Sequence, residues 1–172
     1  GTFEYKNAFN SFNRYNSNDI TIPREDTLIR SVNVNVIPKI NVVKEGLKFN
    51  TSTFTEIPEW ADFEGITNMN SMFTNCDSLV NVRHIDTSSV TRMAYVFNGC
   101  DNIKQIATLD TSNVINMMQL CASCGQLTEF PPFNTSKVTN MARMLDGCSN
   151  LKSVPPLDAR SVAHNSYGLF GY

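Results

Sequence analysis

The sequence predicts an α/β repeat protein: a solenoid of about five rungs, each 24 residues long, after a non-repeating N-terminal segment. Segments that begin at Ile66, Val90, Val114 and Val138 align without gaps at this spacing. Each period contains one short β-branched stretch and one stretch with apolar residues at helical spacing. The first and last copies are degraded, as expected where end rungs must seal a stacked core. We therefore divide the chain into a non-repeating segment, 1–41, and a repeat domain, 42–172.

Several alignment columns keep one kind of residue through four copies, and we expect their side chains to face the core. One column is methionine, one is cysteine and three are aliphatic or aromatic. Their members are Met69, Met93, Met117 and Met141; Cys76, Cys100, Cys124 and Cys148; Leu79, Ile103, Leu127 and Leu151; Val82, Ile106, Phe130 and Val154; and Ile85, Leu109, Phe133 and Leu157.

The copy at 79–102 illustrates one rung. Residues 79–85, LVNVRHI, predict a strand of about four or five residues, stacked in parallel with the strands of neighbouring rungs. The DTSS sequence that follows is typical of a helix N-cap. Residues 90–97 then predict a short helix with an apolar face at i, i+3 and i+7. Asn98 and Gly99 end it, and Gly99 and its equivalent Gly147 suit a positive φ.

A column of acidic or amide residues occupies the predicted cap. It consists of Asp62, Asp86, Asp110, Asn134 and Asp158. Paired carboxylates or a calcium ladder are alternative interpretations, but Asn134 would remove charge from such a site. Helix capping, repeated because the rung repeats, is the interpretation that we favour.

Five cysteines are present, four in one column and Cys121 in addition. Adjacent rungs of a parallel stack lie about 5 Å apart, within disulfide range, so a bridge stays an alternative. We favour free thiols buried in the core. The CASC sequence resembles a redox motif, but the repeat itself places Cys121 and Cys124 in core columns. A straight ladder of thiols does not form the tetrahedron that zinc requires.

Composition excludes several function classes. Fourteen Lys and Arg residues against sixteen Asp and Glu give a net charge of −2, without the basic stripe of a nucleic-acid binder. No apolar run approaches the length of a membrane span, so we predict no membrane insertion by this chain. No catalytic motif is present, and the two histidines, His84 and His164, lie apart in the sequence. We predict neither enzymatic activity nor a cofactor or metal. The chain begins without Met, which suggests a mature or excised product.

Residues 1–41 do not repeat. Val32, Val34 and Val36 alternate with polar residues, which predicts a half-buried strand. We expect this segment to cap the exposed edge of the first rung. The alternative is that residues 1–41 attach the repeats to a larger chain or particle.

The repeats resemble a known family. DTSSVTRMAYVFNGCDNI and DTSNVINMM are similar to the BspA-like leucine-rich repeats of bacterial surface lipoproteins, over residues 42–170. EFPPFNTSKVTNM and SVPPLDARSV resemble a Pro-Pro subtype found in gut bacteria and their phages. The resemblance implies a leucine-rich-repeat solenoid that acts extracellularly, on a bacterial surface or a phage virion. It identifies no ligand.

Outward strand positions vary from rung to rung while the core columns stay constant, as in a scaffold for recognition. They are Asn81, Arg83, His84, Gln105, Thr108, Glu129 and Ser153. We predict that this face binds a protein or a glycan on a cell surface. The alternative is a structural spacer or particle-decorating protein whose contacts go through residues 1–41.

Overall fold

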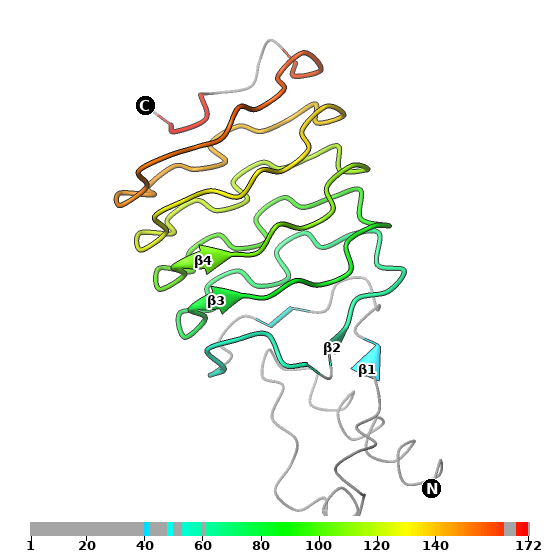
Figure 1. Ribbon diagram of the computed structural model, residues 1–172, viewed down its shortest axis with the longest axis vertical. Helices are drawn as coiled ribbons and strands as arrows, with labels where there is room; N and C mark the ends of the chain where they lie inside the picture. Colours follow the sequence, from blue (N-terminus) through cyan, green and yellow to red (C-terminus); the bar gives the residue numbers. More distant parts are fainter. Residues whose placement is uncertain (1–39, 42–47, 50–52, 60, 164–167, 172) are drawn as a thin grey trace, which may run out of the picture.

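The computed structural model describes residues 40–41, 48–49, 53–59, 61–163 and 168–171 (Figure 1). The strand predicted around Val32, Val34 and Val36 lies outside them. Of the segment 1–41 only β1 (Ile40–Asn41) is described, and it pairs in parallel with β2 (Ala61–Asp62). The other parallel pair joins β3 (Asn81–Val82) and β4 (Gln105–Ile106).

Consecutive copies of the repeat lie side by side, and parallel backbone pairing joins each to the next (Figure 1). On one side of the copies, β3 and β4 pair Asn81 with Gln105 and Val82 with Ile106. On another side, single parallel bridges join Asn68 to Arg92, Arg92 to Asn116, and Asn116 to Asn140. All these partners are 24 residues apart, so the period of the sequence is also the register of the backbone pairing.

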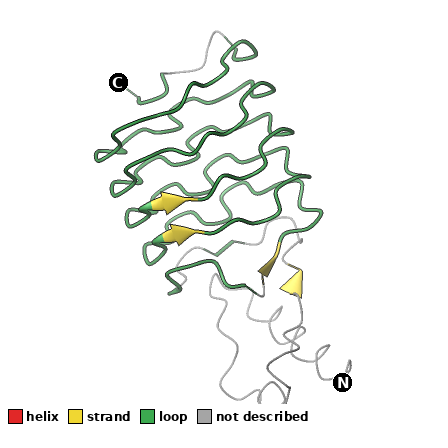
Figure 2. Ribbon diagram, in the orientation of Figure 1, coloured by secondary structure: helices red, strands yellow, loops and turns green. Residues whose placement is uncertain are grey.

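The helix predicted for residues 90–97 is wrong. This segment is a series of turns, and no helix occurs in the described ranges (Figure 2). Amides of the segment donate to carbonyls of the next copy: Met93 to Asn116, Tyr95 to Met118, and Phe97 to Leu120. These donors cannot also close the i to i−4 bonds of a helix. A segment of eight residues is also too short to form a helix without tertiary support.

Two positions in each copy have a left-handed backbone. Gly99 and Gly147 have φ angles of 73° and 74°, which confirms the prediction for both glycines. The other position is Ser71, Tyr95, Gln119 and Arg143 in successive copies, with φ between 49° and 62°. A left-handed residue interrupts a right-handed helix, so this second position is a further reason why the predicted helix does not form.

Each copy contributes one stretch of chain, or pass, to each side of the stack. The core lies between the passes of the opposite sides and consists of the predicted columns. Their members are buried in the central copies, whereas Cys148, Leu151, Val154 and Leu157 are only partly buried and pack against the core. The rings of Phe49, Phe73 and Phe97 stack, with centroid separations of 5.0 and 5.7 Å. Cys121 continues this column in the next copy. The apolar side chains therefore form one continuous cluster that passes through the copies.

We expect Gly147→Ala to lower the free energy of unfolding by about 1–3 kcal/mol, because an L-residue is strained at this φ. An added Cβ would also lie 3.3 Å from Cα of Ser123 in the preceding copy. Urea denaturation measures the change. Gly125→Ala is the matched control, since a Cβ there meets nothing closer than Ser149 Oγ at 3.8 Å. Equal destabilisation by both substitutions would contradict this account.

Candidate functional site

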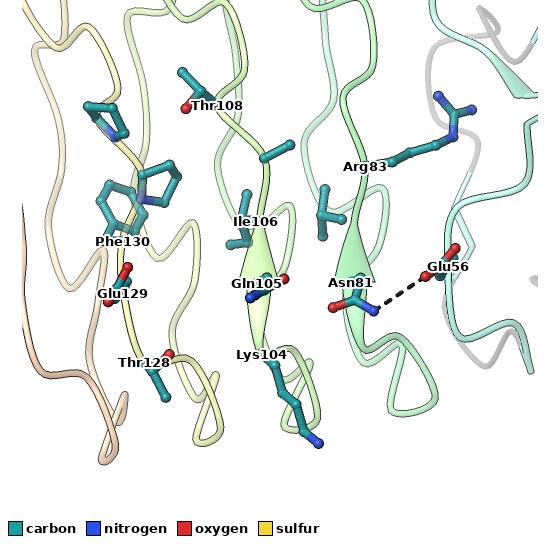
Figure 3. Close-up of a pocket in the computed structure, with 14 residues that line it drawn as sticks. Glu56, Asn81, Arg83, Lys104, Gln105, Ile106, Thr108, Thr128, Glu129 and Phe130 are labelled. Atoms are coloured by element: carbon teal, nitrogen blue, oxygen red, sulfur yellow. Dashed lines mark hydrogen bonds between the residues drawn. The ribbon is translucent and has the colours of Figure 1, made fainter.

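A groove crosses one side of the stacked copies, over the pass of chain that includes β3 and β4 (Figure 3). Its volume is about 710 Å³. Residues of four neighbouring passes line it: Glu56, Asn81, Val82, Arg83, Lys104, Gln105, Ile106, Ala107, Thr108, Thr128, Glu129, Phe130, Pro131 and Pro132. The groove therefore belongs to the stack and not to any single copy.

A row of polar side chains, hereafter the polar row, follows this groove from copy to copy. It consists of Glu56, Asn81, Gln105, Glu129 and Ser153. Backbone pairing sets its register, by joining Glu56 to Asn81, Asn81 to Gln105, and Glu129 to Ser153. The next residue along each of the central passes is a core side chain, such as Ile106 or Phe130. Because successive strand residues face opposite sides, the polar row faces outward over the core (Figure 3).

The groove brings together five of the seven residues predicted for the ligand-binding face. These are Asn81, Arg83, Gln105, Thr108 and Glu129. His84 and Ser153 do not line the groove, although Ser153 pairs in register with Glu129.

The guanidinium of Arg83 forms hydrogen bonds with main-chain carbonyls of the chain itself. It donates to the main-chain carbonyls of Ile57 (2.9 Å), Pro58 (2.7 Å) and Ala61 (3.2 Å), and to that of His84 (2.9 Å). The first three carbonyls belong to the preceding copy. Arg83 thus connects β3 to the chain around β2, and each of its three side-chain nitrogens already donates to the main chain.

His84 and Asn81 also interact with neighbouring copies. His84 Nδ1 lies 3.1 Å from the carbonyl oxygen of Thr108, to which it must donate. Asn81 Nδ2 donates to Glu56 Oε1 at 3.3 Å (Figure 3). By contrast, the side chains of Gln105 and Glu129 make no hydrogen bond within the described part of the chain. Among the members of the row that line the groove, these two have side chains free to bind a ligand.

Sequence reasoning missed three polar lining residues: Glu56, Lys104 and Thr128. The sequence did carry a signal for Glu56, because FTEIPEW resembles LTEFPPF with a shift of one residue. That shift explains why Glu56 pairs with Asn81 at a separation of 25 residues. Lys104 and Thr128 immediately precede the row residues Gln105 and Glu129 in the sequence.

The Asp/Asn column forms Asx turns, which corrects the prediction of helix caps. Oδ1 of each member accepts a hydrogen bond from the amide two residues later. In Asp86 and Asn134 it also accepts the hydroxyl of the following Ser88 or Ser136. Side chains of this type close such local turns readily, and no helix follows for them to cap. Since Asn134 makes the same turn, the turn itself does not require a carboxylate.

The hydrogen bonds of these turns stabilise the ionised carboxylates. The Ser88 hydroxyl and amide lower the pKa of Asp86, and the Ser112 amide lowers the pKa of Asp110. The Arg160 side chain, 2.6 Å from Asp158 Oδ2, lowers the pKa of Asp158 to about 2.

The five cysteines are free thiols. Four of them donate to a carbonyl 27 residues earlier in the chain: Cys76 to Phe49, Cys100 to Phe73, Cys124 to Phe97, and Cys148 to Cys121. The neighbouring Cys76 thiol and burial raise the pKa of Cys100, and burial raises the pKa of Cys121 and, to about 12, that of Cys148. A thiol with a raised pKa is a poor nucleophile and a poor metal ligand. The cysteine column therefore supplies hydrogen-bond donors to main-chain carbonyls of neighbouring copies.

Two buried hydroxyls and the imidazole of His84 form hydrogen bonds with the main chain. The hydroxyls of Thr87 and Thr111 are buried and donate to main-chain carbonyls of the next copy. His84 bonds a carbonyl, as above, and His164 lies outside the described residues. Within the described ranges, no group of three or more His, Cys, Asp or Glu residues could hold a metal ion. The side chains that line the groove can donate and accept hydrogen bonds.

We expect Arg83→Ala to destabilise the fold by about 1–3 kcal/mol, because it leaves several main-chain carbonyls without their donor. Lys104→Ala is the control, since the Lys104 ammonium makes no hydrogen bond to the described residues and its loss should change stability little. Urea denaturation compares the two variants. Equal stability of Arg83→Ala and the parent chain would show that the guanidinium contacts do not support the fold.

The lowered pKa values predict sensitivity to acid. A carboxylate with a lowered folded pKa contributes stability above its unfolded pKa, and that contribution is lost as the pH falls through the folded value. For Asp158 this loss falls between about pH 4 and pH 2. Asp86→Asn, Asp110→Asn and Asp158→Asn combined should therefore flatten the decline of the urea midpoint over this range.

The matched control is Asp101→Asn, because the Asp101 carboxylate accepts no hydrogen bond from the described residues. This variant should keep the steep decline of the parent chain. A triple variant that declines as steeply as Asp101→Asn would exclude these carboxylates as the source of acid sensitivity.

A protein-family model matches more than half of the chain. The family described as "Mycoplasma protein of unknown function, DUF285" matches residues 41–156, which include every residue that lines the groove and all the central copies. No curated protein and no solved structure shows significant similarity to the chain. Among the described residues, no helix has the length and apolar character needed to cross a bilayer.

Proposed function

The chain belongs to the DUF285 family of Mycoplasma proteins of unknown function, and we propose that it is a non-enzymatic recognition module that presents its groove to a ligand on a cell surface. One observation carries this proposal. The polar row changes from Asn81 to Gln105 to Glu129 in successive copies, while the core columns beneath it keep their character. A constant core under a varied outward surface is the arrangement that recognition by repeat proteins uses.

We further propose that the copies form a leucine-rich-repeat solenoid of the BspA-like type. Parallel pairing at 24-residue intervals and a core that runs through all copies support this fold. In such a solenoid the stacked strands form an extended surface for binding. The groove along β3 and β4 occupies this surface (Figure 3).

The proposed location is extracellular, on a bacterial cell surface or a phage virion, and the ligand is a protein or glycan of a cell surface. The resemblance of the repeats to bacterial surface proteins supports this location. The surface of the chain agrees with it, because 17% of the residues are charged and the net charge is −2. Contacts of such a surface depend on hydrogen bonds more than on a strong electrostatic field.

A structural spacer is the second candidate function, and one observation favours it. β1 pairs with β2, so Ile40 and Asn41, at the end of the segment 1–41, lie next to the first copy. A segment in this position could fix the stack to a larger particle. In that case residues 1–41, and not the groove, would carry the contacts.

We expect the labelled chain to bind saturably to one class of cells, and the double variant Gln105→Ala, Glu129→Ala to lose that binding. Both side chains are exposed and free of hydrogen bonds to the described residues, so the variant should fold like the parent chain. Flow cytometry with gut bacteria, mammalian cells and extracellular matrix measures the binding, and circular dichroism checks the fold.

Gln126→Ala is the matched control, because Gln126 is an exposed glutamine that does not line the groove. Cell binding that survives the double substitution but disappears when residues 1–41 are deleted would reject recognition by the groove. It would favour the spacer instead.

A further inference from the structure

We infer that the groove binds a linear, uncharged polysaccharide whose chain lies along the polar row, with successive sugars over successive copies. This inference rests on the proposed recognition function and names the chemical class of its ligand. Four properties of the groove lead to it: its free polar groups, its lack of apolar anchors, its balanced charge and its spacing.

The free polar groups match sugar hydroxyls. Gln105 presents an amide that donates and accepts, Glu129 presents a carboxylate that accepts, and Lys104 presents an ammonium that donates. None of these three side chains forms a hydrogen bond with another described residue. A sugar hydroxyl both donates and accepts, so neighbouring hydroxyls of one ring can satisfy such a mixture of groups.

The groove exposes no large hydrophobic side chain of the kind that anchors protein partners, although Pro132 in its lining is exposed. Tight protein interfaces are centred on aromatic or aliphatic side chains that enter pockets. Here Ile106 and Phe130 are only 8% and 4% exposed. Within the described ranges the exposed large hydrophobic side chains are Ile115 and Phe170, and neither lines the groove. A polar ligand fits this surface better than the apolar face of a protein.

The charges of the groove favour a neutral ligand. Glu56 and Glu129 supply two carboxylates, and Arg83 and Lys104 supply two cations, so the formal charges of the lining cancel. The Arg83 charge is also partly neutralised by the carbonyls that surround it. A sulfated or otherwise polyanionic glycan would meet the two carboxylates without a free cationic cluster in return.

The spacing of the row suits a polymer of sugars. Parallel neighbours in a ladder lie about 4.8 Å apart, so the paired members of the polar row, Glu56 with Asn81, Asn81 with Gln105, and Glu129 with Ser153, repeat at that interval. Gln105 and Glu129 occupy successive copies but are not themselves paired through the described backbone. An extended glycan advances by a similar distance for each pyranose ring, so one sugar can lie over each copy. An extended peptide repeats its same-side side chains about every 6.6 Å, twice the rise of about 3.3 Å per residue, and falls out of step with the row.

The test uses the full chain and the cells that bind it. Periodate cleaves the vicinal diols of sugars, whereas protease removes surface proteins. We expect periodate to abolish binding and protease to leave it intact. Neutral polysaccharide released from these cells and fractionated by length should then bind in calorimetry, with an affinity that rises with length until the fragment spans the row.

Gln105→Ala and Glu129→Ala should each weaken the binding of the longest fragments by about fivefold, the value of one lost hydrogen bond. Gln126→Ala should leave the affinity unchanged.

Binding that is sensitive to protease, resistant to periodate and still dependent on Gln105 would overturn the polysaccharide as ligand. Recognition by the groove would then stay in place, with a protein as ligand. Binding independent of Gln105 and Glu129 would overturn recognition by the groove itself. An affinity that does not rise with fragment length would overturn the alignment along the row.

Discussion

Backbone hydrogen bonding between residues about 24 positions apart is the constraint on which the rest of this structure depends. The described strands are only two residues long, so regular sheets satisfy few of the buried amides and carbonyls. In the turn segments, alternate amides such as those of Met93 and Tyr95 donate to the next copy, whereas others, such as that of Cys100, donate to a carbonyl three residues earlier in their own copy. Because a buried polar group without a partner is costly, each copy needs its neighbour in register to fold at all.

Side chains add further hydrogen bonds between copies to those of the backbone. Thiols of the cysteine column and hydroxyls of the threonine column donate to carbonyls of adjacent copies, inside or at the edge of the core. A hydrogen bond is also kept where one copy has a different residue at the acceptor position. Arg92 stands where Asn68, Asn116 and Asn140 close a local turn, and there Asn70 of the preceding copy supplies the missing acceptor to the Ala94 amide at 2.9 Å. Sequence drift in one copy is thus compensated by the copy next to it.

The same dependence explains what could be predicted from the sequence. The repeat period, the core columns and the left-handed glycines follow from residue type and spacing alone. The helix at 90–97 does not, because apolar residues at i, i+3 and i+7 also suit a curled segment whose amides point to a neighbour. In the groove, Gln105 and Glu129 were identifiable as outward polar positions. The roles of Arg83 and His84 were not, since their partners are main-chain carbonyls of the adjacent copies, which no local pattern reveals. Glu56 was hidden by the one-residue shift of the first copy.

Different residues stabilise the fold and face a ligand, and this separation affects binding. Stability resides in the core columns and in bonds between copies, so an outward side chain such as Gln105 can change without cost to the fold. One copy, however, offers a ligand only one or two such groups, and a net hydrogen bond contributes only about 1 kcal/mol. A ligand that touched a single copy would therefore bind weakly. A ligand that repeats in step with the copies gains the same small contribution several times over, once its first unit is in place. The periodicity that the backbone requires for folding is thus also what gives a periodic ligand its advantage at this groove.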